Sequence, residues 1–120
     1  MAKRDVYVMI LFDAHVEERE WLREVCAGLE EEGVPYRLQP WHEREPSAAR
    51  LGCIAAESSP LQVGIGLDRY GVIHLHHEKL KSPEPYLRDG WQNGRALGKN
   101  AGRLVKGLPL YVHAGKKREE

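Results

Sequence analysis

The feature that most restricts the fold of this chain is an uninterrupted apolar run from Val6 to Phe12, which ends at Asp13. A strand with one face in water alternates apolar and polar residues, whereas a strand buried on both faces is apolar throughout. The run therefore predicts a central strand of a parallel sheet. It is too short to cross a bilayer, and too short for a signal-peptide core followed by a cleavage site.

Beyond this run, segments with helical spacing of apolar residues alternate with short strand-like segments. Helices are predicted at residues 16–32, 46–57 and 91–107. Further strands are predicted at residues 35–39, 61–67, 72–76 and 110–112. Loops are predicted at residues 40–45 and around Pro83 and Pro85. This alternation predicts an α/β fold, a helix–sheet–helix sandwich whose sheet is mostly parallel, with residues 72–76 as its antiparallel strand.

The predicted strand at residues 61–67 has two unlike faces. One face is apolar, whereas the other carries Gly64 and Gly66. A glycine face allows the backbone of a helix to approach closely. The two glycines also resemble part of a dinucleotide-binding fingerprint, but the third glycine is missing, and a hairpin turn at residues 68–71 replaces the expected helix. Close packing is therefore favoured over nucleotide binding.

Size and charge exclude several classes of function. The 120 residues suffice for one domain, 1–120, of which 114–120 is expected to be a frayed tail. Eighteen basic residues balance eighteen acidic ones, so no net charge attracts nucleic acid or an anionic membrane. Cys26 and Cys53 are interpreted as buried small residues, although their spacing does not exclude a disulfide. We expect a cytoplasmic protein.

The sequence contains no nucleophile elbow, HExxH or P-loop motif, and therefore gives little support to catalysis. His74 and His76 share one strand face, and His77 follows, so two imidazoles lie close enough to bind one metal ion. Further ligands are needed, and the remaining histidines are scattered: His15, His42 and His113. An edge strand with exposed histidines is the favoured interpretation.

The first predicted helix ends in three consecutive acidic residues, Glu30, Glu31 and Glu32. Each carboxylate at the negative end of the helix dipole is unfavourable by about 0.3–1 kcal/mol when exposed. No basic residue lies three or four positions earlier to offset them. Glu31 projects almost opposite the apolar stripe, and Glu32 lies at its edge. The end is either solvated or offers a carboxylate to a cation on a partner.

The longest predicted helix carries a basic stripe opposite its glycine-rich core face. The stripe consists of Arg95, Lys99, Arg103 and Lys106. Such a stripe is either solvated or docks onto an acidic surface of another subunit.

Three longer segments occur in a distinctive order and spacing: WLREVCAGLEEEGVPYRLQ at 21–39, AAESSPLQVGIGLD at 55–68 and LGKNAGRLVKGLPL at 97–110. Together they resemble the small subunits of reactivating factors for adenosylcobalamin-dependent diol and glycerol dehydratases. The resemblance covers most of the chain apart from its ends and the loop at 40–47. The histidine-rich segment 74–80 departs from the family pattern.

The resemblance implies a three-layer fold with a mixed five-stranded sheet and a non-catalytic, chaperone-like role. In that family, the small subunit pairs with a large subunit similar to Hsp70-type ATPases. The pair releases damaged cobalamin from inactivated dehydratase in cycles of ADP and ATP binding. The small subunit alone holds no cofactor. A glutamate of the LEExGVP segment helps to hold Mg²⁺ in the large subunit's nucleotide site, and the matching position here is Glu31.

The rest of the acidic helix end and the basic stripe are candidates for partner binding: Glu30, Glu32, Arg95, Lys99, Arg103 and Lys106. The resemblance also implies a cytoplasmic location, with association with a bacterial microcompartment left open. The sequence distinguishes neither a glycerol dehydratase client from a propane-1,2-diol dehydratase client, nor a monomer from a self-associated isolated chain.

Two other interpretations stay open. The chain resembles the medium subunit of the dehydratase itself, which contributes to cobalamin binding. The longer N-terminal region of those medium subunits and the helix ending EEEGVP favour the reactivating factor instead. The second interpretation is an unrelated α/β interaction or metal-binding module that uses His74 and His76.

Overall fold

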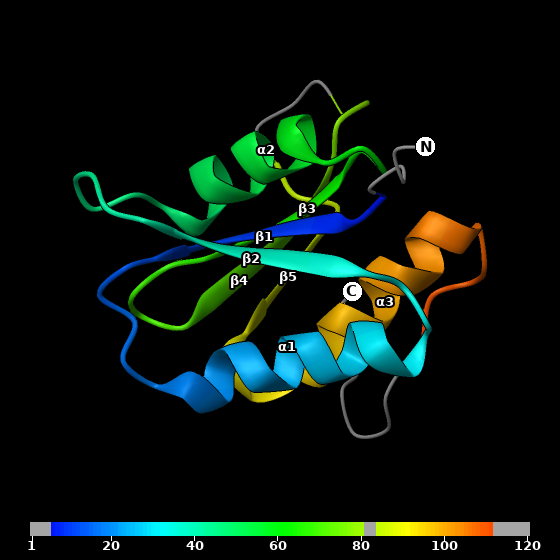
Figure 1. Ribbon diagram of the computed structural model, residues 1–120, viewed down its shortest axis with the longest axis horizontal. Coiled ribbons are helices and arrows are strands. Elements are labelled where there is room, and N and C mark those ends of the chain that lie inside the picture. The colour runs from blue at the N-terminus through cyan, green and yellow to red at the C-terminus, as the bar shows by residue number, and fades with distance from the viewer. Residues whose placement is uncertain (1–5, 81–83, 112–120) are drawn as a thin grey trace, which may run out of the picture.

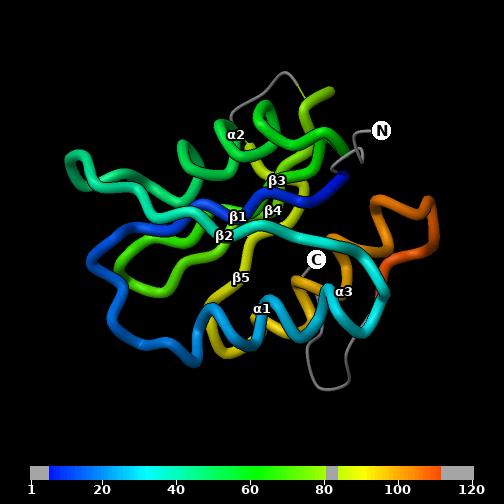
Figure 2. Tube along the Cα trace, viewed as in Figure 1, coloured from blue at the N-terminus to red at the C-terminus, as the bar shows by residue number. Residues whose placement is uncertain are grey.

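The structure, a computed structural model, describes residues 6–80 and 84–111, and it contains a five-stranded sheet between two layers of helix (Figure 1). Along the chain the elements are β1 (Val8–Asp13), α1 (Arg19–Glu31), β2 (Tyr36–Trp41), α2 (Ala48–Ser58), β3 (Val63–Leu67), β4 (Val72–His77), β5 (Leu87–Gly90), the 3-10 turn η1 (Trp91–Asn93) and α3 (Gly94–Lys106). Helix α2 covers one face of the sheet, and α1 and α3 lie side by side on the other (Figures 1 and 2).

The sheet has the strand order β2-β1-β3-β4-β5. Strand β1 is parallel to both β2 and β3, whereas β4 is antiparallel to β3 and to β5. Strand β4 therefore runs against the other four. The predicted three-layer α/β sandwich, with a mixed sheet and one antiparallel strand, is confirmed.

The fifth strand is not where the sequence predicted it. The sequence predicted a strand at residues 110–112, but Leu110 and Tyr111 have no strand conformation, and residue 112 lies outside the described residues, as does the tail 114–120. The strand is instead β5, in the segment predicted as a loop. The strand is short, as suits a sheet edge, and Leu87 is the one large apolar residue among its four, so the segment gives no periodic apolar signal.

The helix ends follow their local signals. Helix α1 stops where Gly33 adopts a left-handed φ of +70°, and the amide of Val34 then donates to the carbonyl of Leu29 at 3.1 Å. Helix α2 begins after Ser47, whose hydroxyl accepts a hydrogen bond from the Arg50 amide at 3.0 Å. Strand β2 extends through Pro40, which the sequence predicted as loop, because an edge strand tolerates a residue without an amide donor.

The core has one part on each side of the sheet. The larger part lies between the sheet and α1 and α3, and the smaller part lies under α2. A Cβ atom added to Gly64 would lie 2.1 Å from the amide nitrogen of Ala56, and one added to Gly66 would lie 2.4 Å from the carbonyl oxygen of Ala48. The glycine face of β3 therefore brings α2 into backbone contact with the sheet, as predicted.

The prediction of an edge strand with exposed histidines is wrong. Strand β4 lies inside the sheet, and His74 and His76 are 9% and 1% exposed. They fit because they lie beside Gly66 and Gly64 of β3, and because Gly52 of α2 leaves room for the ring of His76. Burial first, and then the neighbouring His76 and Arg88, lower the pKa of His74 to about 4.

The buried histidines do not form a metal site with their neighbours. The Nδ1 atom of His76 lies 3.4 Å from the sulfur of Cys53, while its Nε2 atom lies 3.4 Å from His74. Because Cys53 and His74 lie at opposite nitrogens of the His76 ring, a single metal ion cannot bind all three side chains. In the described part of the chain, no group of three His, Cys, Asp or Glu side chains is placed to hold a metal ion.

Both cysteines are free thiols, so the structure contains no disulfide between Cys26, which is buried, and Cys53, which is partly exposed. Over residues 6–80 and 84–111, none of the helices combines the length and apolar character that a bilayer crossing needs.

Candidate functional site

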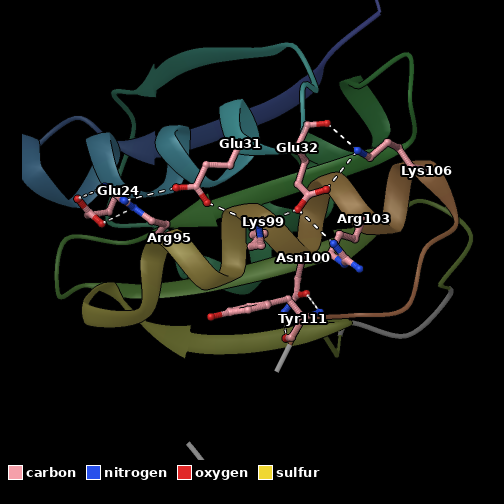
Figure 3. A network of polar contacts seen from close by, with 9 residues as sticks. All are labelled: Glu24, Glu31, Glu32, Arg95, Lys99, Asn100, Arg103, Lys106 and Tyr111. Carbon is pink, nitrogen blue, oxygen red and sulfur yellow. Dashed lines mark hydrogen bonds and ion pairs between the residues drawn. The ribbon is translucent and has the colours of Figure 1, made fainter. Parts of the chain in front are cut away.

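The predicted acidic residues of α1 and basic residues of α3 meet because the two helices cross at glycines. A Cβ atom on Gly28 would lie 2.1 Å from the carbonyl oxygen of Arg95, and one on Gly98 would lie 2.1 Å from that of Val25. The two backbones are therefore in contact. Charged side chains at the edge of this crossing reach across from one helix to the other (Figure 3).

Glu32 is the most enclosed of the three acidic residues, with its side chain 7% exposed. Its carboxylate lies 3.0 Å from Lys99 Nζ, 3.1 Å from Lys106 Nζ and 3.3 Å from Arg103 Nη1. Lys106 also donates to the backbone carbonyl of Glu32 at 2.7 Å. The hydrogen bond from Lys99, followed by those from Lys106 and Arg103, lowers the pKa of Glu32 to about 2, against the opposing effect of burial.

Glu31 is more loosely held than Glu32, and its side chain is 43% exposed. Its carboxylate lies 3.4 Å from Arg95 Nη1 and 3.6 Å from Lys99 Nζ. The expectation that Glu31 faces away from the core more than Glu32 is confirmed. As predicted, no basic residue of α1 offsets Glu31; its two cations, Arg95 and Lys99, come from α3.

Glu30 points to a third environment. It accepts a hydrogen bond of 2.5 Å from the hydroxyl of Tyr36 in β2, and this bond is the first cause of a raised pKa of Tyr36. Glu30 thus contacts a phenol, Glu31 contacts two cations at 3.4 Å and 3.6 Å, and Glu32 contacts three cations at 3.0–3.3 Å. Only the carboxylate of Glu31 combines exposure with long ion pairs.

Every member of the predicted basic stripe contacts a carboxylate of α1 or of Glu32, the residue that caps α1: Arg95, Lys99, Arg103 and Lys106 (Figure 3). The stripe therefore joins α3 to α1 within the chain. Its contact with a partner stays a prediction.

On the other side of α3, the side chain of Asn100 hydrogen-bonds both the amide and the carbonyl of Tyr111, donating to the latter at 3.0 Å.

A second polar cluster, which sequence reasoning missed, lies at the carboxyl end of β1. Asp13 is 1% exposed, and its carboxylate lies 2.8 Å from Arg69 Nε and 3.1 Å from His15 Nδ1. Burial alone would raise the pKa of Asp13, but hydrogen bonds from the His15 amide and Arg69 outweigh it and lower the pKa. An acidic residue directly after a buried strand was the available signal.

The sequence has clear relatives. Residues 7–111 match the family described as dehydratase medium subunit, which is the class of protein that this fold defines. A probable glycerol dehydratase-reactivating factor small subunit of Citrobacter freundii is 45% identical over 93 residues, covering 74% of this chain and 79% of the relative. The diol dehydratase-reactivating factor small subunit of Klebsiella michiganensis is 42% identical over 92 residues, covering 73% and 71%.

Two solved structures share the fold. A glycerol dehydratase reactivase superposes with a TM-score of 0.83 at 40% identity, over 90% of this chain and 98% of the other. A diol dehydratase-reactivating factor complexed with ADP and Mg²⁺ gives a TM-score of 0.76 at 34% identity, over 92% and 100%. The chain belongs to the small subunits of dehydratase-reactivating factors. These relatives favour that family over the dehydratase medium subunit itself and over an unrelated metal-binding module.

Proposed function

We propose that this chain is the non-catalytic small subunit of a cytoplasmic reactivating factor, paired with a large Hsp70-like ATPase subunit. Together they release damaged cobalamin from an inactivated adenosylcobalamin-dependent diol or glycerol dehydratase. The observation that carries the proposal is the family match, since relatives named as reactivating factor small subunits are 37–45% identical. Nucleotide and Mg²⁺ are held in the large subunit. A relative of the same fold, a diol dehydratase-reactivating factor solved with ADP and Mg²⁺, supports the presence of nucleotide and metal in the assembly.

We further propose that Glu31 is the residue through which this chain contributes to the metal site. An exposed carboxylate oxygen is a hard ligand that suits Mg²⁺. The two cations that Glu31 contacts both have closer carboxylate partners, because Arg95 lies 3.1 Å from Glu24 and Lys99 lies 3.0 Å from Glu32. Moving Glu31 to an outside cation therefore leaves neither of them unpaired.

The experiment is Glu31→Gln in the assembled complex of small and large subunits. We expect the affinity for ADP in the presence of Mg²⁺ to fall about tenfold, equivalent to 1.4 kcal/mol. Titration calorimetry with and without Mg²⁺ measures the affinity for ADP. The variant should bind ADP more weakly than the wild type only when Mg²⁺ is present. Glu20→Gln in the first turn of α1 is the matched control, since it removes the same charge far from the acidic end.

Two further measurements test whether the Glu31→Gln chain still folds and still assembles. Circular dichroism should show the fold of the Glu31→Gln chain unchanged, and size-exclusion chromatography should show that it still joins the large subunit. If the complex forms and the affinity for Mg²⁺–ADP equals that of the wild type, the ligand role of Glu31 is rejected.

A further inference from the structure

We infer that Glu24 is a positioning residue for Glu31: by holding the guanidinium group of Arg95, it keeps the Glu31 carboxylate available to a cation on another polypeptide. The inference rests on the proposed role of Glu31. It assigns a function to a residue outside the acidic helix end, one that lies two turns earlier on the same face of α1.

The geometry of Arg95 is the first observation. Its Nε and Nη2 atoms lie 3.1 Å and 3.2 Å from the two carboxylate oxygens of Glu24, which is a two-point contact with the fork of the guanidinium (Figure 3). Only Nη1 is directed at Glu31, at the longer distance of 3.4 Å. Two-point contacts between arginine and a carboxylate are stronger than single ones, so Glu24 is the preferred partner.

The second observation is that the other cation near Glu31 is occupied in the same way. Lys99 lies 3.0 Å from Glu32 but 3.6 Å from Glu31. Glu24 and Glu32 therefore lie on either side of Glu31, and each binds more closely than Glu31 does a cation that both contact. Because the side chain of Arg95 is 52% exposed and projects from the helix edge, it can turn to a new partner when its present one is removed.

The number of charges at this crossing indicates what would happen if the Glu24 carboxylate were removed. The cations there outnumber the carboxylates that bind them, namely Glu24, Glu31 and Glu32, by four to three. Without Glu24, the fork of Arg95 is free, and the carboxylate nearest to it is Glu31. A two-point contact between Arg95 and Glu31 would compete directly with a divalent cation for the same oxygens.

The test is Glu24→Gln in the assembled complex. We expect its affinity for ADP in the presence of Mg²⁺ to fall three- to tenfold by calorimetric titration, although Glu24 itself contacts no metal. Adding Arg95→Gln to the same chain should return the affinity to within twofold of wild type, because the competing cation is gone. Glu20→Gln, which removes one acid from the same helix, should stay within twofold throughout.

The isolated chain provides a readout that is independent of any partner. In the wild-type background, Glu31→Gln should change the Tm by about 1 °C or less, because Arg95 keeps Glu24. In the Glu24→Gln background, Glu31→Gln should lower the Tm by about 2–4 °C, the size expected for an exposed ion pair in a domain of this length. An equal change in both backgrounds would overturn the inference.

The outcomes separate this inference from the proposed function. If Glu31→Gln weakens Mg²⁺–ADP binding and Glu24→Gln does not, the positioning role is wrong and the role of Glu31 stands. Failure of Arg95→Gln to restore the affinity also rejects it. If neither glutamate variant changes the affinity, the ligand role of Glu31 is wrong, and the positioning role of Glu24 is rejected with it.

Discussion

At the scale of single residues, the end of α1 shows how neighbouring residues of one type acquire different tasks. Glu31 and Glu32 are adjacent, yet their side chains are 43% and 7% exposed because successive helical positions point about 100° apart. Glu32 lies against α3 and receives three cations, so its carboxylate fastens the two helices together. Glu31 lies outside that contact and is left with the two longer ion pairs.

The lowered pKa of Glu32 predicts a specific acid sensitivity. The carboxyl group titrates near 2 in the folded chain and at the ordinary value of 4.5 in the unfolded chain, so the folded state binds its proton more weakly. Its stabilising effect is complete above pH 4.5 and is lost as the pH falls from 4.5 towards 2.

Urea unfolding of the wild type and of Glu32→Gln measures this contribution. We expect the wild type to be more stable at pH 6, and the difference between the two chains to shrink steadily below pH 4.5. Glu30→Gln, whose carboxylate contacts Tyr36 instead of α3, is the comparison variant. A difference between wild type and Glu32→Gln that stays constant from pH 6 to pH 2.5 would contradict the prediction.

At the scale of elements, the crossing of α1 and α3 decides which charges meet. The backbones of two helices can touch only where neither helix carries a side chain at the crossing. Here Gly28 and Gly98 leave that space free. Larger residues would separate the axes and move the basic residues of α3 out of reach of Glu31 and Glu32.

Gly98→Ala tests the crossing. The new Cβ would lie 2.1 Å from the carbonyl oxygen of Val25, and a backbone atom cannot move aside as a flexible side chain can. We expect a loss of stability of about 3 kcal/mol, the upper part of the range for overpacking, measured by urea unfolding. Gly94→Ala is the matched control, because its Cβ would lie 3.1 Å from a methyl group of Val25 and 3.4 Å or more from its other neighbours, and about 1 kcal/mol or less is expected. Equal losses for the two variants would mean that the crossing is not tight.

At the scale of the whole molecule, the sandwich matches solved reactivating factors over 90% of the chain or more. A small subunit of this kind should act only in an assembly. Residues 7–111 match the family described as dehydratase medium subunit. Under the proposed function, we therefore expect this chain and the medium subunit of the client dehydratase to dock on related surfaces.

A reconstitution experiment tests this function directly. An inactivated adenosylcobalamin-dependent dehydratase is mixed with large reactivating subunit, ATP, Mg²⁺ and fresh coenzyme, with or without this chain. We expect dehydratase activity to return only in the complete mixture, because the proposed function assigns the release of damaged cobalamin to the two subunits together. Recovery of equal activity without this chain would refute the proposed function.

Much of the fold could be predicted from the sequence because its signals are local. The apolar run around β1, the glycine face of β3 and the stop signal at Gly33 each depend on residues within one element or one turn. The family could be identified for a related reason, since the three matching segments keep their order and spacing. The acidic end of α1 and the basic stripe of α3 were likewise visible as separate features.

Only the tertiary structure decided which of these features meet. Arg95 and Glu31 are 64 residues apart, and no local pattern pairs them; the glycine crossing does. The histidines of β4 look exposed in sequence and are buried because α2 packs over their face of the sheet, where Gly52 leaves room for the ring of His76. Strand β5, which gave no clear signal in the sequence, makes β4 an interior strand. Periodicity determines the face on which a residue lies, but contact between faces depends on packing across the whole chain.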